Sequence, residues 1–186
     1  MDDVGRTWTL PRARATCEVM PPAVAALLVS FVAFLIGLTL PDLDLRMWLG
    51  HRSAITHSIL PACALLARRR WHPAACGMGA GTGLHLAADT FPNAMVGYAT
   101  VKLPLVGALS AGGSYVWLAA NALGGLALAV WLSRRLHARL AAGLLGLAAL
   151  VAGAGYLWRT DGGWPVLALA GGLAWAVGRL WVRRAS

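Results

Sequence analysis

Charged residues are scarce in this chain of 186 residues. Asp, Glu, Lys and Arg make up only 12% of it, and only seven residues are acidic. Soluble domains carry about 25% charged and about 45–50% apolar residues, whereas 59% of this chain is hydrophobic. The shortage of charge argues against an ordinary soluble domain and favours a compact bundle of helices in a membrane.

Cysteine is also scarce. Cys17, Cys63 and Cys76 form no C-x-x-C pair, and their number is odd. This pattern argues against a disulfide framework and against thiolate metal ligands. We interpret the three as small buried apolar side chains.

Acidic residues are fewer than basic ones: the chain has 16 Lys and Arg residues and seven Asp and Glu residues, which gives a formal net charge of +9. A basic balance is typical of nucleic-acid binding. Here the arginines lie between apolar runs, where basic residues set membrane topology. We therefore predict a lipid bilayer, and no nucleic acid, as the partner of the chain.

Long apolar runs are abundant. A membrane-spanning helix needs about 20 apolar residues, and six candidate spans lie at 21–40, 54–67, 73–91, 113–132, 140–157 and 163–181. The second is the shortest. The predicted fold is thus an all-α polytopic transmembrane helix bundle of about six spans. The apolar segment from Pro92 to Gly113 is expected to be an external, re-entrant loop, which is tolerated where it is buried in protein.

Three parts follow from this division: a cytoplasmic tail at 1–20, a half of three spans and a loop at 21–112, and a C-terminal half of three spans at 113–186. With the N-terminus inside, twelve of the sixteen basic residues lie on the cytoplasmic side. The other four are Arg46, Arg52, Lys102 and Arg159. Because short cytoplasmic loops collect Lys and Arg, we expect a bacterial inner-membrane protein with both termini in the cytoplasm.

Four glycines punctuate the third candidate span. Gly77, Gly79, Gly81 and Gly83 form two interleaved G-x-x-x-G pairs. Small residues at this spacing let helices approach closely in lipid. A nucleotide-binding interpretation is poor, because no strand precedes the run and no P-loop Lys follows it. We expect this span to be tightly packed between neighbours.

Half of the chain's twelve carboxylates and histidines fall in two short motifs. The motifs are LPDLDLRMWLGHRSAITHS, with Asp42, Asp44, His51 and His57, and GLHLAAD, with His85 and Asp89. The six predicted spans bring all six residues to one membrane face, the periplasmic or external one. His85 and Asp89, four apart, also share one face of a helix.

Ionisable groups at membrane depth are costly unless they are paired. Shared metal ligation removes much of that cost, and mixed nitrogen and oxygen ligands suit Zn²⁺, Mn²⁺ or Fe²⁺. We therefore predict a site for one or two divalent ions, with Zn²⁺ or Mn²⁺ favoured, among these six residues. Arg52 is expected to hold a substrate anion, and Thr56 to support a ligand or cap a helix, with Ser53 as the cap of the second span.

The same residues resemble a known family, the predicted inner-membrane metal-dependent hydrolases called YdjM-like, which are LexA-regulated in some bacteria. The resemblance rests on LPDLD at 40–44, HRSAITHS at 51–58, GTGLHLAAD at 81–89 and the Pro- and Gly-containing loop at 90–104. It covers about residues 35–110. It implies a metal-dependent hydrolase whose motif positions are the six Asp and His residues.

The predicted function is hydrolysis of a phosphoester or related bond in a lipid-linked or membrane-proximal substrate, with the metal activating water. Asp44 or His51 is expected to be a further ligand or the general base. Two alternatives stay open: a metal or proton transporter, because intramembrane Asp and His often mark ion routes, and a non-catalytic membrane protein with a structural metal site.

Overall fold

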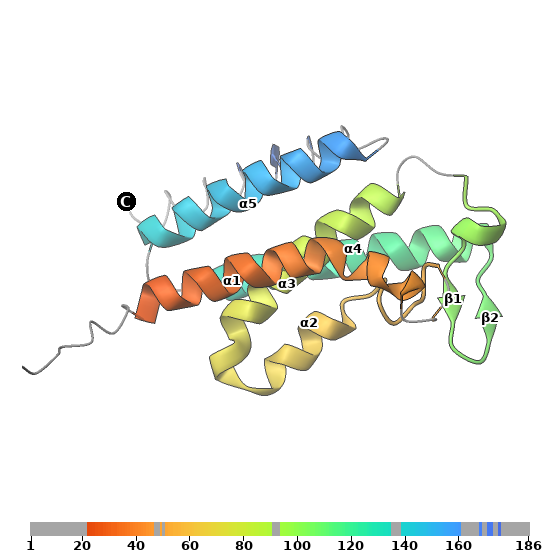
Figure 1. Cartoon of the computed structure of the whole chain (residues 1–186), viewed down its shortest axis with the longest axis horizontal. Helices are drawn as coiled ribbons and strands as arrows, with labels where there is room; N and C mark the ends of the chain where they lie inside the picture. The colour runs from red at the N-terminus through yellow and green to blue at the C-terminus, as the bar shows by residue number, and fades with distance from the viewer. Residues whose placement is uncertain are drawn as a thin grey trace, which may run out of the picture.

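The computed structural model describes residues 22–46, 49, 51–90, 94–134 and 139–160, together with 168, 171, 172 and 175. The predicted N-terminal tail and most of the predicted sixth span lie outside the described residues. The division into two halves stays a prediction. The described part is mostly helical, with five α-helices and one short hairpin (Figure 1).

Helix α3 (His72–Thr90) is the centre of the fold and lies between α1 (Pro22–Thr39) and α4 (Ala111–Ser133) (Figure 1). Its two glycine pairs face different neighbours. A Cβ atom on Gly77 or Gly81 would overlap carbonyl oxygens of α1, and one on Gly79 or Gly83 would stand 3.0 Å from carbonyl oxygens of α4. The predicted close approach is confirmed, and each G-x-x-x-G pair serves one interface.

Helix α5 (Arg139–Arg159) runs beside α1 and closes the other side of the core. Phe34 and Leu38 of α1 meet Leu84 of α3 and Leu157 of α5 in one buried cluster. The C-terminal end of α5 therefore lies at the same end of the bundle as the C-terminal end of α1.

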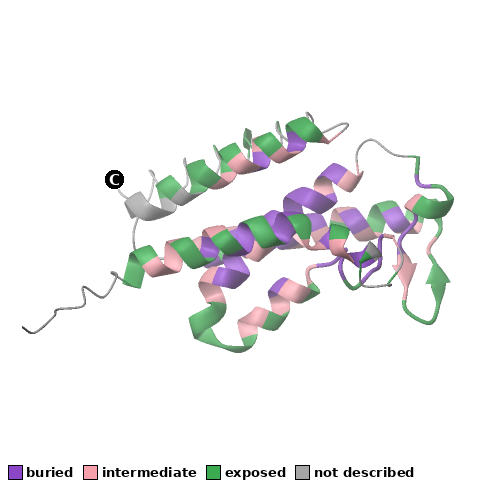
Figure 2. Cartoon of the chain, viewed as in Figure 1, coloured by how far each residue is buried: buried purple, intermediate pink, exposed green. Residues whose placement is uncertain are grey.

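Two of the described helices, α1 and α4, are long and apolar enough to cross a membrane. Their outward sides carry large apolar residues, such as Leu28 and Val32 on α1 and Val116 and Leu123 on α4, all more than half exposed (Figure 2). Bare apolar sides of this extent are typical of a surface that meets lipid or a partner. The full count of six spans stays a prediction.

The segment 54–67 does not form the continuous helix that was predicted. Helix α2 covers only Leu60–Ala64, and a 3₁₀ turn follows at Leu65–Ala67. Pro61 lies in the first turn of α2, where its missing N–H is tolerated, and a helix cannot continue backward through it. Ser58 accepts a hydrogen bond from Leu60 N, so residues before α2 form turns, and Ser53 does not cap this helix.

The connection from α3 to α4 contains two strands that the all-α prediction missed. Strand β1 (Lys102–Leu103) pairs antiparallel with β2 (Gly107–Ala108). The rest of the connection packs inward: Met95 and Val101 are buried against Leu86 of α3. These two side chains pack into the protein, the hairpin itself projects outward (Figure 1), and a re-entrant position in the membrane stays a prediction.

Candidate metal centre

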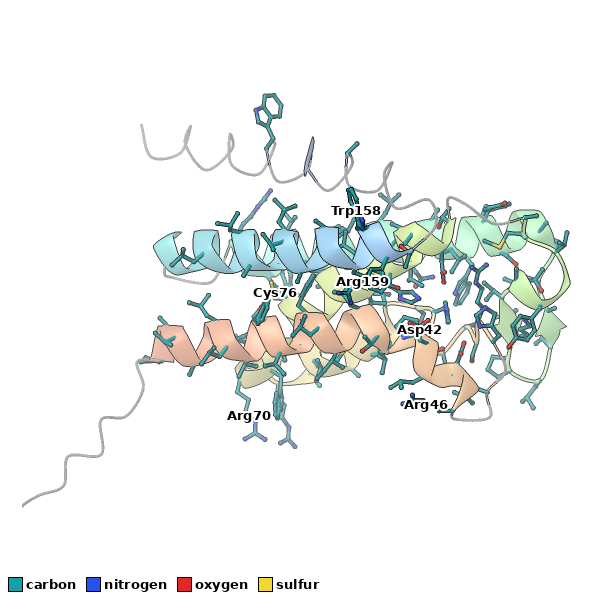
Figure 3. All side chains as sticks on the ribbon, turned by 45° about the horizontal axis from the view of Figure 1, so that its top comes forward. Asp42, Arg46, Arg70, Cys76, Trp158 and Arg159 are labelled. Carbon is teal, nitrogen blue, oxygen red and sulfur yellow. The ribbon has the colours of Figure 1, made fainter. Side chains whose placement is uncertain are left out.

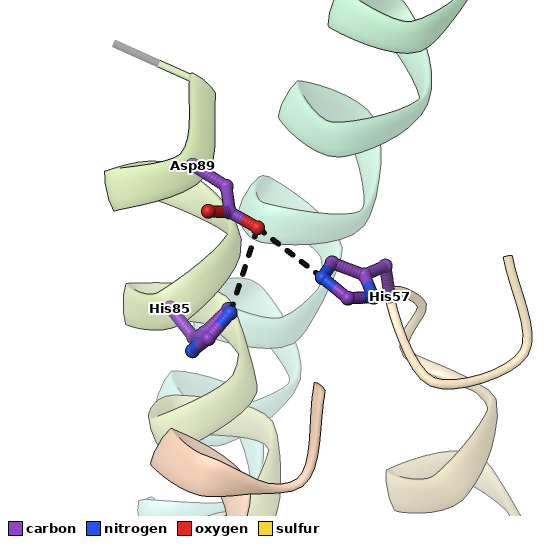
Figure 4. A group of neighbouring side chains, drawn as sticks. All are labelled: His57, His85 and Asp89. Carbon is purple, nitrogen blue, oxygen red and sulfur yellow. Dashed lines mark ion pairs between the residues drawn. The ribbon is translucent and has the colours of Figure 1, made fainter. Parts of the chain in front are cut away.

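Three side chains from two distant motifs meet at one end of the bundle (Figure 4). His57 comes from the turns before α2, and His85 and Asp89 come from the last two turns of α3. The Nε2 atoms of His57 and His85 lie 3.3 Å and 3.5 Å from Oδ2 of Asp89. One ligand atom from each residue lies within 4.8 Å of the others, so the group has the spacing of a metal site.

A main-chain carbonyl fixes the ring of His85. Its Nδ1 lies 2.9 Å from the carbonyl oxygen of Leu38, which can only accept a hydrogen bond. Nδ1 therefore carries the proton, and Nε2 of the neutral imidazole keeps a free electron pair. The hydroxyl oxygen of Tyr156, on α5, lies 2.6 Å from the same Nδ1 and shares this N–H.

His57 is oriented by its neighbours in the same way. Its Nδ1 lies 3.4 Å from Oδ2 of Asp44 and 3.2 Å from Oγ1 of Thr56. The Thr56 hydroxyl donates to the carbonyl of Ser53, so its oxygen faces the ring as an acceptor. Both neighbours can accept a hydrogen bond from Nδ1, so Nε2, which faces Asp89, is the nitrogen that would ligate an ion. The indole N–H of Trp117 donates to the His57 carbonyl at 2.8 Å and holds the backbone in place.

Arg52 positions the carboxylate of Asp89. Its Nη2 donates to Oδ1 of Asp89 at 3.1 Å, and its Nη1 donates to the carbonyl of Ala99 at 2.7 Å. Arg52 is buried and has a φ of 58°, a left-handed backbone conformation that is uncommon for a residue other than glycine. Oδ1 of Asp89 is thus engaged, and Oδ2 is turned toward the imidazoles.

The geometry fits a cation with nitrogen and oxygen ligands. Oδ2 of Asp89 is buried and, within the described residues, has no hydrogen-bond partner. Two imidazole Nε2 atoms point at it, and a carboxylate held in this way is balanced either by protons on the imidazoles or by a cation bound between the three groups. Separations of 3.3 Å and 3.5 Å are about those between neighbouring ligands of a tetrahedral ion with bonds of about 2 Å. His57, His85 and Asp89 are therefore the residues that would hold a divalent ion.

The other three predicted ligands surround this group at different places. Asp42 is 60% exposed, with Oδ1 3.7 Å from Nε2 of His85. Asp44 is fully buried behind the ring of His57, where Oδ2 also accepts from Ser53 N at 3.2 Å. These contacts place Asp42 at the rim of the site and give Asp44 a positioning role, and ligation by either residue stays a prediction.

His51 lies beside the three-residue group without joining it. Its ring stacks on Tyr98 with centroids 4.5 Å apart and meets His57 edge-on at 6.4 Å. Its Nδ1 is buried and has no hydrogen-bond partner in the part of the chain that the structure describes. Burial lowers the pKa of His51 below its usual value.

The contacts also bear on the roles predicted for Arg52 and Thr56, and they add Tyr156 to the site. Both terminal nitrogens of Arg52 bind protein atoms, so the predicted contact of Arg52 with a substrate anion stays untested while its hold on Asp89 is evident. Thr56 supports His57, as one of its two predicted roles required. Tyr156 was missed by sequence reasoning, because a tyrosine in an apolar helix carries no local signal of a site 71 residues away.

Asp42, at the rim of the centre, lies where α1 ends, and Arg70, which precedes α3, lies farther back along the helices (Figure 3). Arg159, at the C-terminal end of α5, is at the same end of the bundle as Asp42 (Figure 3).

No protein-family model, curated protein or solved structure matches the chain. The resemblance to the YdjM-like hydrolases therefore stays a prediction.

Proposed function

We propose that the chain is a membrane-embedded, metal-dependent hydrolase in which His57, His85 and Asp89 hold a divalent ion. One observation carries this proposal: two imidazole Nε2 atoms converge on the same buried carboxylate oxygen, at 3.3 Å and 3.5 Å, and the three ligand atoms lie within 4.8 Å of one another. A bound divalent ion supplies Lewis acidity, which polarises a phosphoryl or carbonyl oxygen and eases deprotonation of water.

The number of protein ligands favours catalysis over a closed structural site. Structural zinc sites use four protein ligands, whereas catalytic sites use three and keep one position open. Three ligands converge here, and the exposed carboxylate of Asp42 lies next to His85. The side that Asp42 occupies is the one from which water and substrate reach the site.

The remaining polar groups divide into positioning and proton-transfer roles. Asp44 and Arg52 orient His57 and Asp89 through the contacts described above. His51 is the best-placed proton acceptor, since its Nδ1 has no hydrogen-bond partner among the described residues and its ring contacts His57. A general base must lie within reach of the proton that it takes and must be free to accept it.

The proposed substrate is a phosphoester or related bond at the membrane surface. Of the two candidate spans, α1 ends and α4 begins at the end of the bundle that holds the ligand group. Membrane crossing by these helices would place the ligand group near the surface of the bilayer, within reach of a lipid-linked or membrane-proximal group. The distribution of basic residues favours an orientation with the site on the external side, and the inner membrane of a bacterium is what the resemblance implies.

The test compares two histidines of the same chain. Wild type, His57→Ala and His72→Ala are purified in mild detergent after growth with Zn²⁺ and Mn²⁺. Metal per chain is measured by elemental analysis, and hydrolysis is measured on a panel of phosphoesters. His72 is the first residue of α3 and so lies at the opposite end of that helix from His85 and Asp89.

We expect bound metal and hydrolysis in wild type and in His72→Ala, and the loss of both in His57→Ala. A wild-type protein that binds no metal would contradict the proposal. Metal lost from His57→Ala without hydrolysis by wild type on any tested ester would restrict the centre to a structural role.

A further inference from the structure

The tip of the β1–β2 hairpin exposes large apolar side chains beside the candidate metal centre. Leu105 is 108% exposed and Val106 is 79% exposed. Val96 and Tyr98, in the segment that leads to the hairpin, are 69% and 65% exposed. Apolar surface of this kind is unfavourable in water, and such clusters mark sites of contact with a protein or a membrane.

The backbone conformation at position 105 disfavours leucine, so the presence of an apolar side chain there calls for a reason outside the fold. Leu105 has a φ of 66°, a left-handed conformation that glycine adopts readily and that side chains with a Cβ adopt at a cost. Glycine or asparagine would relieve the backbone and remove an exposed apolar side chain. Leu105 is fully exposed, so internal packing does not account for its presence.

The base of the hairpin is held firmly, so the tip is held out from the bundle. Lys102 N donates to the carbonyl of Arg52, and Ala54 N donates to the carbonyl of Lys102, both at 2.9 Å. Val101, just before β1, is fully buried. The hairpin is therefore fixed to the same loop that carries the positioning residue of Asp89.

The hairpin is placed where a membrane surface would be. It lies at the end of the bundle where α1 ends and α4 begins, and it runs across the helix axes (Figure 1). The exposed apolar sides of α1 and α4 lead up to that end (Figure 2). Lys102 adds positive charge, with its ammonium 5.1 Å from the ring centre of Tyr98. Aromatic and basic residues next to apolar ones are typical of the boundary between lipid headgroups and acyl chains.

We propose that the tip formed by Pro104, Leu105 and Val106 inserts into the headgroup boundary of the bilayer. The inference rests on the membrane placement in the proposed function and is independent of hydrolysis. It fixes the rim of the metal centre at the lipid surface. A substrate headgroup then reaches the ligand group by moving along the membrane, without leaving it.

The experiment measures the depth of the tip directly. Cys17, Cys63 and Cys76 are replaced by Ala, and Leu105→Cys is labelled with a small environment-sensitive fluorophore. The protein is placed in phosphatidylcholine–phosphatidylglycerol vesicles that contain lipids with a nitroxide near the headgroup or deep in the acyl chain. Leu28→Cys, on the exposed side of α1, is the matched control for membrane crossing, and aqueous iodide reports exposure to water.

We expect the Leu105 label to be quenched most by the headgroup-proximal nitroxide and weakly by iodide, and the Leu28 label to be quenched most by the deep nitroxide. Quenching at 28 together with strong iodide quenching at 105 would overturn the hairpin inference and leave membrane placement intact. A Leu105 label shielded from lipid and iodide alike would also overturn it, because protein would then cover the tip. No lipid quenching at either position would overturn the membrane placement itself.

Discussion

The hydroxyl of Tyr156 lies 2.6 Å from Nδ1 of His85, a contact that ties α5 to the candidate metal centre. The carbonyl of Leu38 lies 2.9 Å from the same nitrogen. His85 is therefore oriented by groups from two other helices, Leu38 of α1 and Tyr156 of α5. Partners of this kind raise the basicity of a ligating imidazole and hold its ring in place.

Tyr156→Phe should weaken metal binding without unfolding the protein. The substitution removes one acceptor from Nδ1 and leaves the aromatic ring and the Leu38 carbonyl. We expect affinity for Zn²⁺ or Co²⁺ to fall roughly 10-fold, the lower end of the effect of such outer partners, with a changed absorption spectrum of bound Co²⁺. Competition with a chromophoric chelator measures the affinity. Trp158→Phe, on the same helix and 70% exposed, is the control, and an unchanged affinity in Tyr156→Phe would deny the role of Tyr156.

Arg52→Met should destabilise the folded chain. It leaves Oδ1 of Asp89 and the carbonyl of Ala99 without their donors, and breaking one side of a buried ion pair costs about 3–5 kcal/mol. Denaturation in mild detergent with chelator present measures the loss. The double variant Arg52→Met with Asp89→Asn should recover part of it, because the stranded charge is gone.

The same variant separates the two roles considered for Arg52. A positioning residue lowers stability and metal affinity together when it is removed. If Arg52→Met instead unfolds like wild type and only raises KM for an anionic substrate, the prediction made from the sequence, that Arg52 binds the substrate, would be the better one.

Gly81→Ala should separate α1 from α3. The added methyl would overlap the carbonyl oxygen of Phe34, and overpacking of this kind costs about 1–3 kcal/mol. Gly155→Ala is the matched control, because its added methyl would meet no described atom within 4 Å apart from its chain neighbours and the backbone of its own helix, and Ala is the better helix former by about 1 kcal/mol. Opposite shifts in the midpoint of thermal unfolding are expected, and equal shifts would argue against tight α1–α3 contact.

Sequence reasoning succeeded where a local pattern has a direct structural consequence. The glycine spacing predicted close helix contacts, and the i, i+4 spacing of His85 and Asp89 placed both on one helical face. The meeting of His57 with His85 and Asp89 was also predicted, although the second of the candidate spans used to argue it is not a continuous helix. Each of these inferences needs only periodicity and connectivity.

It failed where the outcome depends on the surroundings in space. The apolar run at 54–67 has the composition of a span, yet Pro61 and the hydrogen bonds of Ser58 give turns before α2. The left-handed backbone of Arg52 and the approach of Tyr156 to His85 come from tertiary contacts. Neither leaves a mark in the neighbouring sequence.

Asp42 and Asp89 face the same edge of His85, and their burial predicts different effects of mutation. Asp89→Asn should abolish metal binding, because Oδ2 of Asp89 is the point at which both imidazoles converge. Asp42→Asn should keep the metal with affinity reduced by no more than roughly 10-fold, because Asp42 is 60% exposed and its carboxylate lies 3.7 Å from Nε2 of His85.

Removal of the metal extends the comparison of Asp42 with Asp89, because an ion present at about 100 times its Kd stabilises the folded state by about 2.7 kcal/mol. Chelator should therefore lower the unfolding midpoint of wild type and Asp42→Asn, and leave Asp89→Asn unchanged. Loss of the chelator effect in Asp42→Asn would make Asp42 a fourth ligand, and a shell closed by four protein ligands would argue for a structural ion and against hydrolysis.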